Sequence, residues 1–236
     1  MKISELALSD PELLHNEWNG QKIEEHKIGL LKFSVHSYSH IYDYIFSEVE
    51  TTQVSMIEIG ISGGWSLLCW DRYLQNPESK IIGIDPLPQM LAKIENPEEI
   101  RGRDSPNQFQ TIMRNRMLAD VSKKYSDRVF LCYEDAYTEE TVSGFPDSSF
   151  NIIIDDGSHR PNDKLFVLNH YWSKVRSGGW LIIEDYMSRQ DLDILMPTVF
   201  NLPQVVERII YDGVTKNKIF HLHSDTQEGI IALRKL

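Results

Sequence analysis

Apolar residues along this chain alternate between short continuous runs and stripes at helical spacing. The runs have strand length and predict buried strands, and they lie at residues 54–59, 80–85, 129–133, 150–155 and 180–183. Helical stripes occur at 65–74, 108–124 and 161–175, the last ended by Gly178 and Gly179. A strand, a glycine turn, a helix and a second strand follow one another from residue 54 to 85, which predicts a βαβ unit and a parallel sheet.

The two ends of the chain extend this pattern. Residues 28–49 have apolar positions at helical spacing, so we expect an N-terminal helical segment within residues 1–50. The tail predicts strands at 205–211, 218–223 and 229–234. The sequence therefore predicts an α/β fold in one domain, 1–236, with a Rossmann-like doubly wound, mostly parallel seven-stranded sheet and an antiparallel edge strand.

Prolines interrupt the pattern after the second predicted strand. Pro86, Pro88, Pro97 and Pro106 predict that residues 86–107 form a surface loop. Together with the start of the next helix, this loop is predicted to form a lid-like insertion at about 86–118.

The composition limits the classes of binding partner and the cellular compartment that we expect for this protein. Hydrophobic residues make up 41% and charged residues 25%, as in ordinary globular proteins. The net charge of −11 repels phosphate backbones, so we expect no nucleic-acid partner. The two cysteines, Cys69 and Cys132, favour a reducing cytoplasm. Apolar runs are too short to span a bilayer, and we expect no membrane partner.

A glycine-rich turn follows the first predicted strand, where α/β sheets bind their ligands. Gly60 allows a tight turn, and Gly64 lets a ligand approach main-chain N–H groups. Ser62 stands where a dinucleotide-binding turn has its second glycine, and Glu58 lies inside the strand end. An acid there suits a ligand with an ammonium and a sulfonium better than a pyrophosphate. The turn therefore favours S-adenosylmethionine (SAM) over NAD.

Three further residues complete the predicted cofactor site on this edge of the sheet. Asp85 ends the second strand, where a carboxylate can accept both hydroxyls of a ribose. Asp135 follows the third strand, where its carboxylate can accept from an adenine amino group, and Trp65 directly follows the glycine turn. This order of elements resembles the layout of class I methyltransferases.

Carboxylates gather after the fourth and fifth strands. Asp155 and Asp156 follow the fourth, and Glu184 and Asp185 follow the fifth. Like charges at neighbouring strand ends are costly unless a cation neutralises them. Hard oxygen ligands favour Mg²⁺, with Mn²⁺ and Ca²⁺ as alternatives. Asp155 and Asp156 could instead cap the next helix. His159 lies three residues after Asp156, where its imidazole could face a substrate held by the metal.

The two acidic segments, Ile154-Asp-Asp-Gly-Ser-His159 and Trp180-Leu-Ile-Ile-Glu-Asp185, resemble the macrocin and mycinamicin type of sugar O-methyltransferase. Cephalosporin hydroxylase-like proteins are similar in the same stretch. By position, the resemblance implies that Asp156, Glu184 and Asp185 bind Mg²⁺ and that His159 is the general base. We assign Asp155 to the cofactor side of the cluster. The resemblance also implies a homo-oligomer.

The leading hypothesis from the sequence is a SAM-dependent, Mg²⁺-assisted O-methyltransferase for a hydroxyl of a sugar, a glycan or a sugar-containing metabolite. A vicinal diol held by a cation accounts for the carboxylates, and His159 would take the proton. Two alternatives remain at this stage: a metal-dependent oxygenase of the hydroxylase-like kind, and a non-catalytic partner subunit with a SAM-binding fold.

Overall fold

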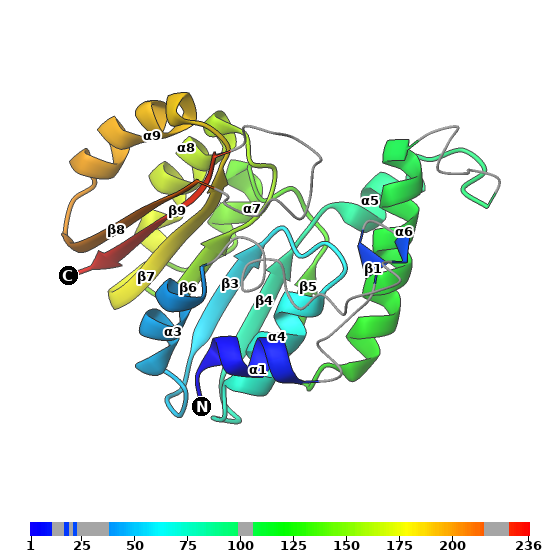
Figure 1. Ribbon diagram of the computed structural model, residues 1–236, viewed down its shortest axis with the longest axis horizontal. Coiled ribbons are helices and arrows are strands. Elements are labelled where there is room, and N and C mark those ends of the chain that lie inside the picture. Colours follow the sequence, from blue (N-terminus) through cyan, green and yellow to red (C-terminus); the bar gives the residue numbers. More distant parts are fainter. Residues whose placement is uncertain (11–16, 19–20, 23–37, 99–105, 215–226) are drawn as a thin grey trace.

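The computed structural model describes residues 1–10, 17–18, 21–22, 38–98, 106–214 and 227–236. Seven strands in this part of the chain form one sheet (Figure 1). Their order is β5 (Val129–Cys132), β4 (Lys80–Ile84), β3 (Ser55–Ile59), β6 (Phe150–Asp155), β7 (Val175–Tyr186), β9 (Gln227–Lys235) and β8 (Val205–Val214). Two short strands, β1 (Glu17–Trp18) and β2 (Gln21–Lys22), form a separate antiparallel pair.

The sheet is parallel from β5 to β7, and β9 runs antiparallel to both β7 and β8. β3 lies between β4 and β6, with Ile57 opposite both Ile82 and Ile153. The chain builds the sheet from β3 outward through β4 and β5, and then on the other side through β6 and β7. The switch point, where such sheets bind ligands, therefore lies between β3 and β6. The predicted doubly wound, mostly parallel seven-stranded sheet with antiparallel pairing at one edge is confirmed.

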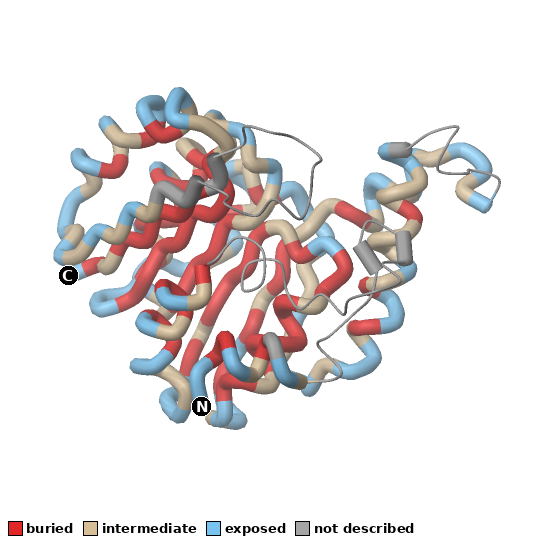
Figure 2. Tube along the Cα trace, in the orientation of Figure 1, coloured by how far each residue is buried: buried red, intermediate tan, exposed pale blue. Residues whose placement is uncertain are grey.

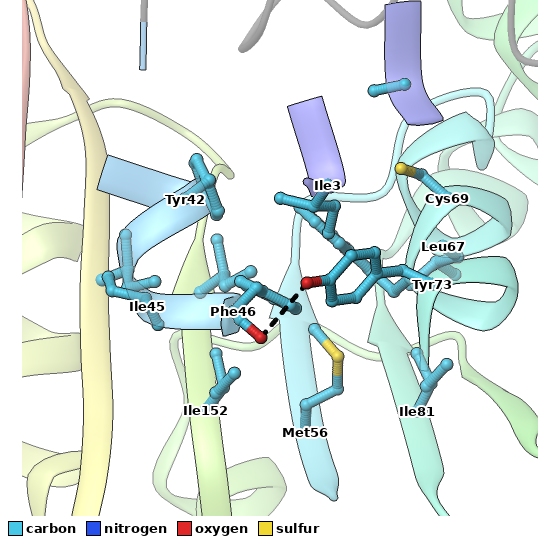
Figure 3. Packing of buried hydrophobic residues seen from close by; sticks show 14 of the residues in the cluster. Ile3, Tyr42, Ile45, Phe46, Met56, Leu67, Cys69, Tyr73, Ile81 and Ile152 are labelled. Carbon is cyan, nitrogen blue, oxygen red and sulfur yellow. Dashed lines mark hydrogen bonds between the residues drawn. The ribbon is translucent and has the colours of Figure 1, made fainter. Parts of the chain in front are cut away.

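Helices pack on both faces of the sheet. One face carries α1 (Ile3–Ser9), α3 (Ser39–Ser47) and α4 (Trp65–Tyr73), and the other carries α7 (Glu139–Ser143), α8 (Pro161–His170) and α9 (Arg189–Asn201). Neighbouring strand residues contribute to opposite cores, because side chains alternate along a strand: Met56 packs in the first core and Ile57 in the second. Figure 2 shows the buried positions concentrated along the strands, and Figure 3 shows Phe46, Met56 and Tyr73 in the first core.

Two helices follow β4 along the chain. These are α5 (Leu87–Ala92) and α6 (Pro106–Val121), which pack on each other. The loop predicted for residues 86–107 is wrong for 87–92 and for 106–107, which are helical. Pro88 lies in the first turn of α5, where a backbone N–H would have no partner within the helix, so a proline is tolerated there. The described part of the predicted insertion 86–118 is thus largely helical, and its movement as a lid stays a prediction.

Other differences from the sequence pattern concern the second half of the chain. α8 ends at His170, and the short 3₁₀ turn η2 (Trp172–Lys174) follows it, as η1 (Ser122–Lys124) follows α6. Gly178 and Gly179 do not end a helix: they lie within β7, where the pairing shifts from Phe150–Val175 to Ile152–Trp180. α7 and α9 were not predicted, although Thr138 and Ser188 accept N-cap hydrogen bonds there.

Two predicted elements cannot be compared with the structure in full. The strand expected at 218–223 lies outside the described residues, and so do residues 28–37 of the N-terminal helical segment. Across the described segments, no helix has the length and apolar character that a membrane span requires.

Candidate active site

The glycine turn after β3 lies directly against the turn after β6. Gly60 has a φ of +82°, and a Cβ at this position would lie 2.2 Å from the Asp156 carbonyl oxygen and 2.5 Å from Gly157 Cα. The N–H of Asp156 in turn donates to the Ile59 carbonyl at 2.9 Å. Only glycine fits at position 60 without displacing this neighbour. The glycine turn, predicted to bind the cofactor, is therefore in van der Waals contact with the turn after β6 that carries the predicted metal ligand Asp156.

The end of the glycine turn is fixed by a residue of a distant segment. Gly64 has a φ of +84°, and its missing Cβ would lie 2.2 Å from the Tyr125 hydroxyl, which donates to the Gly64 carbonyl at 2.7 Å. Ser62, exposed on the turn, adopts a φ of +47°. Trp65 begins α4 half-buried, with the Lys124 ammonium 5.4 Å from its ring centroid. The contact with Tyr125 therefore fixes the conformation of the end of the glycine turn.

Asp85 connects this turn to the start of α5. One of its carboxylate oxygens accepts from the N–H groups of Ile61 and Ser62 at 3.0 and 3.1 Å, and the other accepts from Leu87 at 2.9 Å. Burial raises the pKa of Asp85, while these three N–H groups act in the opposite direction. The predicted ribose acceptor thus sits at the switch point and shapes the turn that the same ligand would contact.

Glu58 and Asp135 occupy contrasting positions. The side chain of Glu58 is fully buried, and one carboxylate oxygen accepts from Ser66 Oγ at 2.8 Å and Trp70 Nε1 at 2.9 Å. These partners belong to α4, so this acid faces the protein interior, and a direct contact with a ligand stays a prediction. Asp135 is exposed after β5 and accepts from the N–H of Tyr137 at 3.0 Å.

Beyond the glycine turn, Asp156, His159 and Asp185 converge from the ends of β6 and β7. One ligand atom from each lies within 4.8 Å of the others, a spacing that a metal ion can bridge. His159 and Asp185 both have left-handed backbones, with φ of +59° and +54°, which non-glycine residues adopt at a cost and often at functional sites. Nδ1 of His159 is buried without a hydrogen-bond partner among the described residues.

Glu184 does not join that set, although the sequence predicted it as a ligand. Its side chain is buried, and the Tyr42 hydroxyl of α3 donates to its carboxylate. The hydroxyl of Tyr38, which immediately precedes α3, donates to Asp185 Oδ1 at 2.7 Å. The structure thus brings together two of the three predicted ligands and the predicted base. From the sequence, both tyrosines lie on the apolar helical stripe of residues 28–49, and with His36 they resemble a His/Tyr cluster of related proteins, but no partner could be assigned to them.

On the opposite face of the sheet, Asp155 belongs to a buried network. Its Oδ1 accepts from the Tyr137 hydroxyl at 2.9 Å, and the Lys164 ammonium lies 3.9 Å from its Oδ2. Burial raises the pKa of Asp155, and Lys164 opposes that shift. Lys164 also donates to the Glu184 carbonyl, so it joins the ends of β6 and β7. Sequence reasoning missed Lys164, and its only signal was a position one turn before the buried Leu168.

Tyr137 also supports the loop that carries His159. Its hydroxyl accepts from the N–H of Ser158 at 2.9 Å, and it fills the place where a Cβ on Gly157 would lie, 2.0 Å away. A side chain at position 157 would displace this hydroxyl. The loop from Asp156 to His159 is therefore held on one side by Gly60 and on the other by Tyr137.

A family model described as a methyltransferase domain matches residues 57–186. This chain belongs to that methyltransferase family. The matched segment contains the glycine turn, Asp85, His159 and both acidic pairs, so the family resemblance that we drew from these motifs is confirmed.

The chain is also similar to curated proteins and to solved structures. The chain is 26% identical over 182 residues to an uncharacterised protein of Acanthamoeba polyphaga mimivirus, covering 76% of this chain and 72% of the relative. It is 24% identical over 157 residues to 8-demethyl-8-(2-methoxy-α-L-rhamnosyl)-tetracenomycin-C 3′-O-methyltransferase of Streptomyces olivaceus, covering 64% of this chain. The mycinamycin-pathway methyltransferase MycE, solved with Mg and SAH, superposes with a TM-score of 0.54 at 19% identity over 89% of this chain.

The matches differ in how much of each relative they include. The chain spans 32% of the length of the Streptomyces enzyme and 51% of MycE. At 19% identity, the likeness to MycE establishes the fold.

Proposed function

We propose that this methyltransferase is a SAM-dependent, divalent-cation-assisted O-methyltransferase that acts on a hydroxyl of a sugar or sugar-containing metabolite. The observation that carries the proposal is the convergence of Asp156, His159 and Asp185 within 4.8 Å, next to the glycine turn. The sugar O-methyltransferase of Streptomyces olivaceus supports the acceptor class. The two free cysteines, Cys69 and Cys132, support a reducing compartment such as the cytoplasm.

The cofactor part of the site is built from the switch point. The glycine turn would bring main-chain N–H groups close to SAM, and Asp85 would accept from its ribose. Asp135 and Trp65 border the same edge of the sheet, from the end of β5 and the start of α4. Glu58 would contribute indirectly, because its hydrogen bonds from Ser66 and Trp70 hold α4, the helix that follows the glycine turn.

The residues at the ends of β6 and β7 fit a hard divalent cation. Asp156 and Asp185 would hold Mg²⁺, or Mn²⁺ or Ca²⁺, because these ions prefer carboxylate oxygens to imidazole nitrogen. When bound, the cation would lower the pKa of a nearby hydroxyl and orient a vicinal diol. Glu184 as a third ligand stays a prediction, which Mn²⁺ binding to a Glu184→Gln variant tests.

His159 is the proposed general base. Its imidazole would accept the proton of the acceptor hydroxyl while the oxygen forms a bond to the methyl carbon of SAM. The carbon–sulfur bond would break in the same displacement, and its electron pair would stay on the sulfur of the S-adenosylhomocysteine product. Alignment of oxygen, carbon and sulfur by the two adjoining turns would supply much of the acceleration. One histidine and two carboxylates, the set found among the described residues, differ from the two-His-one-carboxylate set of iron oxygenases.

The test is incubation with methyl-labelled SAM, Mg²⁺ and a panel of glycosides that carry vicinal diols, beside the same glycosides with blocked hydroxyls. We expect label only on the free diols, and none in excess EDTA. Full transfer in EDTA would refute cation assistance. SAM binding without transfer to any glycoside would instead favour the non-catalytic partner subunit. Light scattering after size exclusion measures whether the protein forms the proposed homo-oligomer.

A further inference from the structure

Tyr38 places a phenol hydroxyl on the acid that completes the proposed cation site. The residue is fully buried immediately before α3, and its hydroxyl lies 2.7 Å from Asp185 Oδ1 and 3.2 Å from the Gly229 carbonyl oxygen. The ring of Tyr211 packs edge-on against it, with centroids 6.3 Å apart. Tyr38 is therefore fixed by its surroundings and can impose an orientation on the carboxylate.

Asp185 needs such a partner because of its place in β7. Successive residues of a strand point to opposite faces, so Glu184 and Asp185 should diverge. Asp185 instead has a φ of +54°, and the pairing between β7 and β9 shifts at this point. Both carboxylates accept from tyrosines four positions apart, Tyr38 and Tyr42, on the same side of α3.

The two tyrosines hold Glu184 and Asp185 in different surroundings. Tyr42 stacks on Trp70 with centroids 5.5 Å apart, and Trp70 donates to Glu58, so Glu184 is tied into the core beneath the glycine turn. Asp185, held by Tyr38, is the acid that lies within 4.8 Å of Asp156 and His159.

We propose that Tyr38 is a positioning residue that aims the Asp185 carboxylate at the cation and thereby sets cation affinity. This inference rests on the proposed function, because it assumes that Asp156 and Asp185 hold the ion. Hydrogen bonds to ligating carboxylates fix their orientation, and their removal typically lowers metal affinity about 10–100-fold.

The test compares Mn²⁺ binding by the wild type, Tyr38→Phe and Tyr73→Phe, followed by electron paramagnetic resonance without acceptor. Tyr73 is a matched control, because its buried hydroxyl donates to the Phe46 carbonyl in the first core (Figure 3), away from the acids. We expect Tyr38→Phe to raise the Mn²⁺ dissociation constant about 10–100-fold, with the affinity for SAM unchanged and Tyr73→Phe like the wild type. In methyl transfer, the KM for Mg²⁺ should rise while kcat at saturating Mg²⁺ stays near the wild-type value.

Further variants separate positioning from general support of the fold. If Tyr38 acts through Asp185, adding Tyr38→Phe to Asp185→Ala should weaken Mn²⁺ binding no further. Equal Mn²⁺ affinity in folded wild type and Tyr38→Phe would overturn the proposal, as would an equal loss of SAM affinity. If Tyr38→Phe does not fold, Tyr38→His, which keeps a ring donor, should bind Mn²⁺ more tightly than Tyr38→Leu, and equal binding would refute the role. Mn²⁺ binding without methyl transfer to any acceptor would count against the proposed function alone.

Discussion

The Cβ that Gly60 lacks would lie 2.2 Å from the carbonyl oxygen of Asp156. Through this contact, the turn proposed to bind SAM and the turn proposed to bind the cation support each other directly. A methyl donor on one turn and a metal-held hydroxyl on the other would then meet without an intervening layer of protein.

Substitution of Gly60 tests this contact. Gly60→Ala must push the turn that carries Asp156 away, because the obstructing atoms belong to backbone. We expect weaker Mn²⁺ binding together with a loss of unfolding free energy above the ~1–2 kcal/mol that a left-handed alanine costs. Gly178→Ala is the matched control, since Gly178 has a φ of +75° but nothing within 4 Å of the added Cβ. Equal effects of the two substitutions on Mn²⁺ binding would contradict the prediction.

Asp85→Ala should weaken the binding of SAM. The substitution removes the proposed ribose acceptor and leaves the N–H groups of Ile61, Ser62 and Leu87 without this partner, so we expect a loss of about 1–3 kcal/mol. Titration calorimetry with SAM measures the effect. Asp147→Ala, an exposed acid paired with Lys174, serves as the control. An unchanged affinity in Asp85→Ala would remove this residue from the site.

His159→Ala should lower kcat about 10²–10⁴-fold with a smaller effect on the affinities for SAM and acceptor, as expected when a general base is lost. His170→Ala is the control, because that ring stacks on Phe166 at 4.1 Å, at the C-terminal end of α8. Single-turnover transfer of labelled methyl groups reports the chemical step. Near-normal kcat in His159→Ala would exclude the proposed base.

Lys164→Met should destabilise the protein by about 3–5 kcal/mol, because it leaves Asp155 as a buried acid without its cation. The loss should also depend on pH. Burial raises the pKa of Asp155 above 3.8 in the folded state, so the folded protein binds more protons than the unfolded chain, and stability falls as the pH rises from that value toward the folded pKa. The Lys164 ammonium opposes the rise in the pKa of Asp155. Its removal should therefore raise that pKa further, and the loss of stability should continue to higher pH.

Urea denaturation of the wild type and of Lys164→Met at several pH values measures how the difference in their unfolding free energies depends on pH. A second substitution, Asp155→Asn, should flatten the added pH dependence of Lys164→Met, because it removes the group that titrates. A deficit of Lys164→Met that is constant with pH would show that Asp155 is not the coupled group.

Much of the fold follows from local pattern. The strand Phe150–Asp155 was predicted with its observed bounds, because the apolar run Ile152–Ile154 at its centre is typical of a strand buried on both faces. The helix α5 was missed, since four prolines masked a short element in which Pro88 occupies a permitted first-turn position. α7 has only five residues and α9 contains Pro197, which argues against a helix, so their clearest signals are the capping residues Thr138 and Ser188.

The sequence by itself determined that carboxylates and His159 gather beside a glycine turn, because parallel strands end at one edge of the sheet and motifs after those strands must meet there. Only the tertiary structure decided which acids face one another. The alternation of side chains along β7 would separate Glu184 from Asp185, and a left-handed backbone at Asp185 overrides it. The partners that hold these acids, Tyr38 and Tyr42, lie 147 and 142 positions away in the chain. Contacts at that separation form only when the chain folds, and no local pattern encodes them.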